Sequence, residues 1–252
     1  MPSQSSASPS AVGTAPVRID LWTWPLEASH RETAALEAIL SADERRRAAS
    51  FVFAADGRRF VVGRARLRQI LSRYVAMPPE ALRFRYGLHG KPALSPARPA
   101  PNFNLSHSGG LAALVIASCH VGIDIEEVRP VDGAVAERFF SAGENAALRG
   151  LRGADWRDAF YRCWTRKEAV VKALGKGLSL RLASFDVSVA PSASLLLRLE
   201  GCRDAASQWS IVDVAFPRGV VGAIAARTMG RGVSVKRHNW GCKWSDGDKL
   251  GD

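Results

Sequence analysis

Two acidic side chains stand two positions apart in a short alternating segment of the chain. In GIDIE, residues 122–126, Asp124 and Glu126 alternate with apolar residues, a pattern typical of a half-buried β-strand. Residues two apart on a strand point to the same face, so the two carboxylates are expected side by side. Such oxygen ligands suit Mg²⁺, which takes one or two carboxylates together with phosphates and waters. The alternative is an ordinary strand face in contact with solvent.

A second candidate group is expected on a helix, in the segment WTRKEAVVKALGKG. Trp164, Glu168 and Lys172 follow one another at intervals of four residues, so they share one helix face and are spaced about 6 Å apart along the axis. A routine surface Glu–Lys pair, worth a few tenths of a kcal/mol, would have the same spacing. On its own the segment favours that surface pair, although the surroundings of Glu168 and Lys172 are unusually apolar: Trp164, Ala169, Val170, Val171 and Leu174.

Two further segments carry groups suited to binding an anion. FNLSHSGG places Ser106 and His107 at a predicted strand end, beside glycines that would let a ligand approach the backbone. The G-x-S-x-G turn of many serine hydrolases is absent, and no second His or Cys lies at metal-ligand spacing. Phosphate binding therefore fits better, although a role in stabilising the turn is equally open. Gly90, Lys91 and Pro92 predict a turn that presents a lysine to an anion, or simply a turn.

The basic residues are concentrated in one part of the chain. The net charge is +11, and residues 45–91 contain eleven Arg and one Lys against one Asp and one Glu. A basic segment of this kind favours an anionic partner, such as nucleic acid, a phosphorylated cofactor or an acidic protein. The alternative is an Arg-rich surface in contact with solvent alone.

Composition also bears on the location of the protein. No apolar run approaches the roughly 20 residues that a membrane-spanning helix needs. The first 16 residues lack the basic start and apolar middle of a secretory signal. Four scattered cysteines form no metal-type pair, so we expect a cytoplasmic protein with reduced thiols. Residues 1–16 and 229–252 are predicted to be a disordered N-terminal tail and a flexible C-terminal tail.

The elements that must position these groups follow an internal repeat. LSADERRRAASF and FSAGENAALRGL share the element S-A-x-E, with Ser41 and Ser141 separated by 100 residues. This is a capping-box pattern that begins a helix, and a longer helical stretch follows each copy. Alternating segments then predict strands in each half. We therefore predict two similar α+β halves, 17–118 and 119–228, packed as a pseudo-two-fold dimer with a site in the cleft between them. Chance similarity is the alternative.

Taken in order, GKP, FNLSHS, GIDIE and WTRKEAVVKALGKGL closely resemble the sequential motifs of the 4′-phosphopantetheinyl transferases. The similarity is to the larger, monomeric Sfp-type group and extends over residues 22–227. It implies a monomeric pseudo-dimer of two α+β halves that moves the phosphopantetheine arm of coenzyme A onto a serine of an apo acyl or peptidyl carrier protein. Adenosine 3′,5′-bisphosphate would be released. The carriers of this family are acidic, which agrees with the basic character of this chain.

The resemblance also implies roles for individual residues. Three carboxylates would hold a Mg²⁺ that bridges the pyrophosphate of the coenzyme: Asp124, Glu126 and Glu168. The residues that would contact coenzyme A are Arg47, Gly90, Lys91, Pro92, Ser106, His107 and Lys172. The catalytic group would consist of Glu168, Lys172 and His107, with Glu168 as the base that accepts the proton of the carrier serine, directly or through a metal-bound water. Residues 131–140 resemble the region where the family docks its carrier.

Other functions fit the sequence less well. A basic nucleic-acid-binding protein would need aromatic residues interleaved with the basic ones, or a known module, and neither is found. A Mg²⁺-dependent nucleotide phosphohydrolase would use the same carboxylates with water as the nucleophile. A relative that only binds coenzyme A would not need the full set of acidic and basic groups. We therefore expect a transferase, with neither a nucleic acid nor a membrane as partner.

Overall fold

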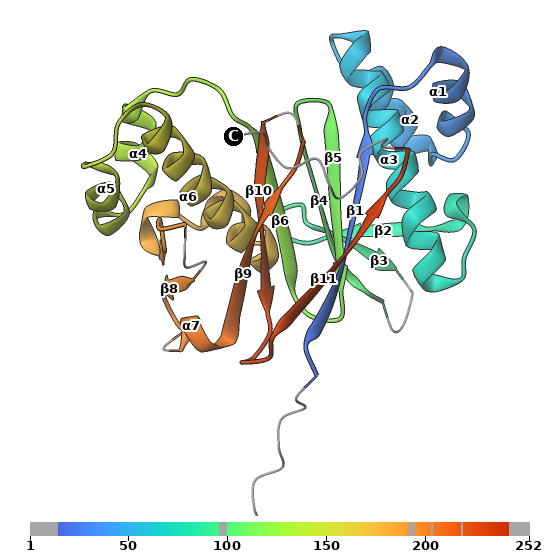
Figure 1. Cartoon of the computed structure of the whole chain (residues 1–252). Helices are drawn as coiled ribbons and strands as arrows, with labels where there is room; N and C mark the ends of the chain where they lie inside the picture. Colours follow the sequence, from blue (N-terminus) through green and yellow to red (C-terminus); the bar gives the residue numbers. More distant parts are fainter. Residues whose placement is uncertain (1–14, 96–99, 192–194, 203, 218, 242–252) are drawn as a thin grey trace, which may run out of the picture.

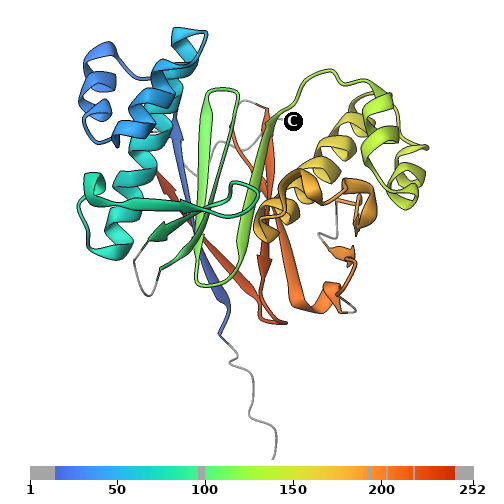
Figure 2. The same cartoon turned by 180° about the vertical axis from the view of Figure 1, so that it is seen from behind.

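A computed structural model of the chain describes residues 15–95, 100–191, 195–202, 204–217 and 219–241. Its strands form a central block with a helical lobe on either side, as Figure 1 and the view from behind in Figure 2 show. Of the two predicted tails, residues 1–14 and 242–252 lie outside the described residues.

The two halves contain the same strand arrangement. One sheet has the spatial order β11 (Val233–Asn239), β1 (Val17–Pro25), β5 (Leu111–Ala117) and β4 (Asn102–Ser108). The other has the order β6 (Val121–Glu127), β10 (Val220–Arg227) and β9 (Trp209–Ala215). The pairs β1–β5, β5–β4, β6–β10 and β10–β9 are all antiparallel. The set β1–β5–β4 of the first half is therefore repeated as β6–β10–β9 in the second.

In each half, three helices directly follow the first sheet strand. These are α1 (His30–Glu37), α2 (Ala42–Ala49) and α3 (Ala54–Val75), then α4 (Gly133–Phe139), α5 (Ala142–Leu148) and α6 (Gly153–Leu174). The longest helices, α3 and α6, have 22 residues each. The smaller elements are η1 (Pro79–Ala81), β2 (Arg83–Tyr86), β3 (Pro92–Ser95), η2 (Gly177–Ser179), η3 (Leu182–Ser184), β7 (Asp186–Val187), β8 (Leu196–Arg198) and α7 (Ala205–Gln208). The prediction of two similar α+β halves is confirmed.

Both predicted capping boxes form, and each one also anchors the long helix that follows. Glu44 closes the box at α2, and its buried carboxylate accepts from Arg68 Nε at 2.7 Å. Glu144 does the same at α5 and accepts from Lys167 Nζ at 2.6 and 2.7 Å. A buried carboxylate therefore joins the short helix to the long one in each half.

The two halves share one apolar core. Buried side chains of β1 and β5 pack with those of β6 and β10, for example Ile19 with Ile123 and Ile224 in one cluster. Separate clusters lie beneath α3 and beneath α6. Among the described residues, no helix combines the length and the apolar character needed to cross a membrane.

The halves meet at a seam between β4 and β6 that uses side chains as acceptors. The backbone N–H of Ile123 donates to Asn104 Oδ1 at 2.8 Å, and that of Glu127 donates to Ser108 Oγ at 2.9 Å. Between these two bonds, the N–H of Ile125 donates to Ser106 Oγ at 3.3 Å. The polar side chains of β4 therefore accept hydrogen bonds from the backbone N–H groups at the edge of β6. These bonds hold the first half against the second.

The prediction of a flexible tail over residues 229–252 is wrong for its first part. Strand β11 pairs in parallel with β1 over its full length, from Val17 opposite Val233 to Thr23 opposite Asn239. Its sequence VSVKRHN looks like a polar tail because β11 is an edge strand with one solvated face. Val233 and Val235, on its other face, pack against the shared core.

Candidate active site

Three carboxyl groups from the second half gather where α6 crosses β6. Asp124 and Glu126 lie on β6, and Glu168 lies on α6. Strand and helix approach closely at Gly122, where a Cβ atom would stand 2.2 Å from the Ala169 carbonyl oxygen. Only glycine fits this contact, which brings the carboxylate of the helix beside those of the strand.

Burial and mutual repulsion act on the carboxyl groups of this cluster in the same direction. Burial raises the pKa of Glu168, and the negative charges of Asp124 and Glu126 raise it further, against the opposing effect of Lys172. Burial and the charge of Asp124 likewise raise the pKa of Glu126. Negative charge held this closely calls for a cation.

Lys172 supplies one positive charge to the cluster. Its Nζ donates to Asp124 Oδ1 at 2.5 Å and to Ser106 Oγ at 3.0 Å. Asp124 is only 3% exposed, and burial raises its pKa while the Lys172 charge acts in the opposite direction. The second oxygen, Asp124 Oδ2, is buried without a hydrogen-bond partner among the described residues.

The donor set fits a hard divalent cation. It offers carboxylate oxygens from β6 and α6, one of which is buried and has no hydrogen-bond partner in the described part of the chain. As the side chains stand, no three His, Cys, Asp or Glu residues of the described part form a ready metal site. Lys172 engages one oxygen of Asp124, which leaves Oδ2 as the oxygen of this carboxylate that is open to a metal.

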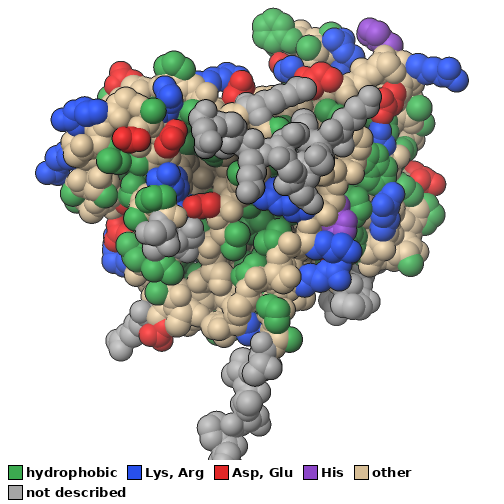
Figure 3. Space-filling view, in the orientation of Figure 1, with side chains coloured by type: hydrophobic (Ala, Val, Ile, Leu, Met, Phe, Trp, Pro, Cys, Tyr) green, Lys and Arg blue, Asp and Glu red, His purple; other side chains and the backbone are tan. Residues whose placement is uncertain are grey.

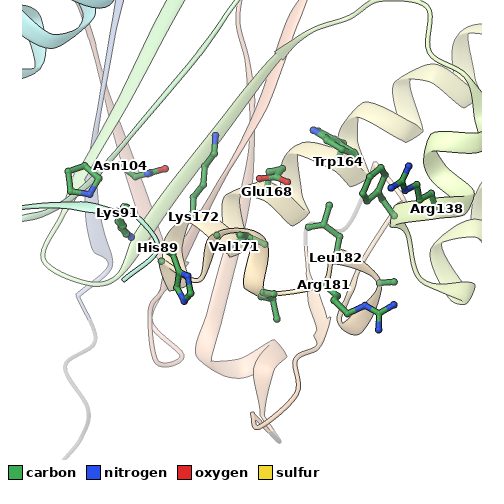
Figure 4. Close-up of a pocket in the computed structure, with 17 residues that line it drawn as sticks. His89, Lys91, Asn104, Arg138, Trp164, Glu168, Val171, Lys172, Arg181 and Leu182 are labelled. Atoms are coloured by element: carbon green, nitrogen blue, oxygen red, sulfur yellow. The ribbon is translucent and has the colours of Figure 1, made fainter. Parts of the chain in front are cut away.

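A cavity of about 780 Å³ opens beside Glu168 and Lys172 (Figure 4). On α6, Trp164, Glu168 and Lys172 lie along the same wall, as their four-residue spacing predicts. The opposite walls come from the turn between β2 and β3, from α4 and from the residues after α6. They include His89, Gly90, Lys91, Pro92, Arg138, Phe139, Leu180, Arg181 and Leu182. Of the predicted carrier-docking region, residues 131–140, this cavity is lined by Arg138 and Phe139.

A second cavity, of about 740 Å³, lies in the first half. Arg47, Arg59 and Arg64 line it, together with His107 from β4. Its walls share Pro92 and Asn104 with the first cavity, so the two adjoin and form one cleft across the seam. This agrees with the prediction of a cleft between the halves.

The arginines of the second cavity differ in how firmly they are held. Arg47 is exposed and lies over the ring of Phe60, 5.4 Å from its centroid. Arg45 does not line the cavity and donates to the Leu40 carbonyl. Arg64 is engaged by Glu44 and by the Tyr86 hydroxyl. Arg47 is therefore the member of the run of three arginines that is available to an anion in this cavity.

Ser106 and His107 point to opposite sides of β4, as neighbours on a strand must. His107 is exposed at the second cavity, and partial burial of its ring and the charge of Lys172 lower its pKa. Ser106 is 5% exposed and lines neither cavity. Its hydroxyl is engaged by Ile125 N–H and Lys172 instead. The expected phosphate contact therefore has no support at Ser106, because the seam uses its hydroxyl.

The predicted turn at residues 90–92 forms, with Gly90 at a φ of 81°. Lys91 lines the cavity, but its ammonium is engaged by backbone carbonyls instead of being free for an anion, as the sequence suggested. Lys91 Nζ donates to the carbonyl oxygens of Val121, at 3.0 Å, and Ala173, at 2.9 Å. Sequence reasoning gave no role to Asn104, His89 or Arg181. The alternating pattern of residues 102–108 could have indicated Asn104, because it places Asn104 on the same polar strand face as Ser106. No sequence pattern indicates His89 or Arg181.

The chain matches two family models that together span both halves. Residues 23–120 match the model described as 4′-phosphopantetheinyl transferase, N-terminal, and residues 120–225 match that of the 4′-phosphopantetheinyl transferase superfamily. The junction between these matches falls in the turn that connects β5 to β6.

Curated relatives give the same result. The chain is 35% identical to the 4′-phosphopantetheinyl transferase HetI of Nostoc sp. over 217 residues, which is 84% of this chain and 89% of the relative. It is 38% identical to the transferase psf-1 of Bacillus pumilus, over 65% of this chain and 70% of the relative. The chain is 35% identical to the transferase Sfp of Bacillus subtilis, over 63% of this chain and 70% of the relative. The chain therefore belongs to the 4′-phosphopantetheinyl transferase superfamily, in its Sfp-type group.

Proposed function

We propose that this protein transfers the 4′-phosphopantetheine arm of coenzyme A to a serine of an apo carrier protein, with Mg²⁺ held by Asp124, Glu126 and Glu168. The observation that carries this proposal is the position of the acidic cluster. It adjoins a cleft whose cavity in the first half is lined by Arg47, Arg59 and Arg64, and whose cavity in the second half combines charged groups with apolar side chains such as Phe139, Trp164 and Leu182. A nucleotide with several phosphates and a long arm needs both basic and apolar contacts.

The coenzyme would extend along the cleft across the seam. Arg47 would bind the 3′-phosphate, since a guanidinium can engage a phosphate through two donors. His107 and Lys172 would donate to the pyrophosphate, and Gly90 and Pro92 would form the turn beside the adenine. The low pKa of His107 leaves its ring neutral at pH 7 unless a nearby phosphate restores the proton.

The carboxylates would hold the metal through hard oxygen donors. When bound, Mg²⁺ neutralises negative charge on the pyrophosphate as the bond to the leaving group breaks. Asp124 supplies a buried oxygen, and Glu126 and Glu168 approach it from β6 and α6. Lys172 would pass from Asp124 to a phosphate oxygen when the coenzyme and the metal bind.

Glu168 would act as the base in the transfer. As the serine Oγ of the carrier bonds to phosphorus, its proton passes to the Glu168 carboxylate, and the bond from phosphorus to the bridging oxygen breaks. Adenosine 3′,5′-bisphosphate leaves with that electron pair.

The carrier would approach over the cavity beside α4. Arg138 and Arg181 are exposed at this cavity, and Figure 4 shows both at its end away from the first half. An acidic partner would be attracted to these charges. We further propose that the protein acts as a monomer in the cytoplasm.

A nucleic-acid partner is less well supported. On the face shown in Figure 3, acidic and basic side chains are interspersed over both lobes. Nucleic-acid surfaces usually carry a continuous basic patch or stripe.

The experiment that separates transfer from hydrolysis is chromatography of the reaction products. With coenzyme A, Mg²⁺ and an apo carrier, the proposal predicts adenosine 3′,5′-bisphosphate in equal amount to modified carrier. Free phosphopantetheine, formed without carrier, would instead indicate a phosphohydrolase.

A further inference from the structure

One half-buried lysine joins three elements of the fold at a single point. Lys91, at the start of the return strand of the β2–β3 hairpin, donates from Nζ to the carbonyl oxygens of Val121 and Ala173. Val121 is the first residue of β6, and Ala173 lies in the last turn of α6. The hairpin comes from the first half of the chain, whereas β6 and α6 come from the second.

The two elements that Lys91 contacts are those that carry the acidic cluster. Asp124 lies three residues after Val121 on β6, and Glu168 lies five residues before Ala173 on α6. Strand and helix are already in tight contact at Gly122, where an added Cβ would lie 2.4 Å from the Ala173 nitrogen. Lys91 therefore fixes the hairpin to a pair of elements that cannot shift freely against each other.

The hairpin forms part of the cleft on its other side. Pro92, the next residue, lines both cavities, and His89 and Gly90 line the one that contains Glu168. Figure 4 shows Lys91 and His89 beside the end of α6 from which Lys172 and Glu168 extend. The bonds of Lys91 thus connect the wall of the cleft in the first half to the carboxylates in the second.

The position is energetically unusual for a lysine. The residue is half-buried, its ammonium makes no ion pair with any residue that the structure describes, and burial lowers its pKa to about 8. The negative end of the α6 dipole offsets part of the cost of burial. Gly175, at the end of α6, provides room, since a Cβ there would lie 3.1 Å from Lys91 Cδ. A methionine would fill the same space without the cost of burying a charge.

We propose that Lys91 is a positioning residue that holds the coenzyme side of the cleft at a fixed distance from the carboxylates on β6 and α6. The proposal rests on the transferase function above. It differs from a direct contact of the lysine amine with the coenzyme, because both bonds of Nζ go to the backbone of the second half. Loss of these bonds would leave the coenzyme bound but misplaced relative to Glu168.

The test compares Lys91→Met with wild type in the full-length protein. Misplacement of a reacting group by about 1 Å can cost on the order of 100-fold in rate. We expect kcat to fall at least about 10-fold in Lys91→Met. The Kd of coenzyme A, measured by calorimetry, should change by less than about threefold. Lys176→Met is the matched control, since Lys176 is exposed in the loop after α6 and lines neither cavity.

Lys91→Arg keeps a cation with several donors, and we expect it to retain most of the wild-type kcat. This variant also decides the matter if Lys91→Met fails to fold by circular dichroism. A Kd that rises 10-fold or more at unchanged kcat would show that the amine binds the coenzyme directly and would overturn the inference. Wild-type kinetics in Lys91→Met would also overturn it. So would a loss of kcat of about 10-fold or more in Lys91→Arg. If wild type itself transfers nothing, the proposed function fails instead.

Discussion

Lys172 Nζ lies 2.5 Å from Asp124 Oδ1, so an ammonium on α6 is bonded to the most buried carboxylate of β6. This ion pair holds together the two elements that carry the acidic cluster. Its positive charge also opposes a cation bound at the same carboxylate, since Lys172 engages Asp124 Oδ1 while Oδ2, which has no hydrogen-bond partner among the described residues, stays open to a metal. Lys172 therefore stabilises the acidic cluster and neutralises part of its negative charge.

Replacing Lys172 with Met tests these two effects separately. Removing a group that stabilises charge in the transition state typically costs about 100-fold to 1000-fold in kcat, and we expect a loss of that order. Binding of Mg²⁺ without coenzyme should become at least as tight as in wild type, since the competing charge is gone. Calorimetry with Mg²⁺ alone measures this. Weaker metal binding in Lys172→Met would contradict the competition.

Glu126 and Glu168 are predicted to differ in their response to metal. Glu126→Gln removes a ligand, so its lost activity should be partly restored as Mg²⁺ is raised. Glu168→Gln removes both a ligand and the base, and general-base catalysis typically contributes about 100-fold to 10,000-fold. We therefore expect a loss in Glu168→Gln that no metal concentration restores. Titration of transfer rate against Mg²⁺ for both variants is the measurement, and full rescue of Glu168→Gln would leave it as a ligand only.

Arg47 is predicted to recognise the 3′-phosphate of the coenzyme. A hydrogen bond to a charged group contributes about 1.5 to 3 kcal/mol, so Arg47→Ala should raise KM for coenzyme A about 10-fold to 100-fold. With 3′-dephospho-coenzyme A, the same substitution should have little effect, because its target is missing. Arg45→Ala, which alters a residue that bonds to the Leu40 carbonyl, is the control. Equal losses on both substrates would mean that Arg47 acts elsewhere.

Glu44 is predicted to make stability depend on acid pH. Burial acts to raise its pKa, but hydrogen bonds from Arg68, the Ser41 backbone and Arg64 outweigh it and lower the pKa below 4.5. The unfolded chain then binds more protons at this site, so the stabilisation is complete above about pH 4.5 and is lost as pH falls through the lower folded value. Glu44→Gln should therefore lose stability at pH 7 and show a flatter acid-unfolding profile. Thermal unfolding from pH 7 to pH 3 checks this, and parallel profiles for the two proteins would contradict it.

Local patterns in the sequence predicted much of this architecture. The capping boxes that contain Glu44 and Glu144 form as predicted, because a cap depends on residues within one turn of helix. The shared face of Trp164, Glu168 and Lys172 follows in the same way from helical spacing. The order of the motifs then predicted the family, which the relatives confirm.

What the sequence did not predict depends on contacts between distant segments. Lys91 stands in the predicted turn, but its amine bonds to Ala173, 82 residues away. Ser106 was grouped with His107 because the two are adjacent, whereas the seam with β6 engages only the serine. The polar sequence of β11 predicted a tail. Its pairing with Val17–Pro25 joins opposite ends of the chain, so no local pattern indicated it.

The most direct test of the central claim is intact-protein mass spectrometry of a panel of apo carrier proteins incubated with this protein, coenzyme A and Mg²⁺. The account predicts that at least one carrier gains the mass of one phosphopantetheine. The gain should disappear with EDTA and with Asp124→Asn, and should persist with Lys176→Met. No gain on any carrier, from a protein that still binds coenzyme A tightly, would contradict the account.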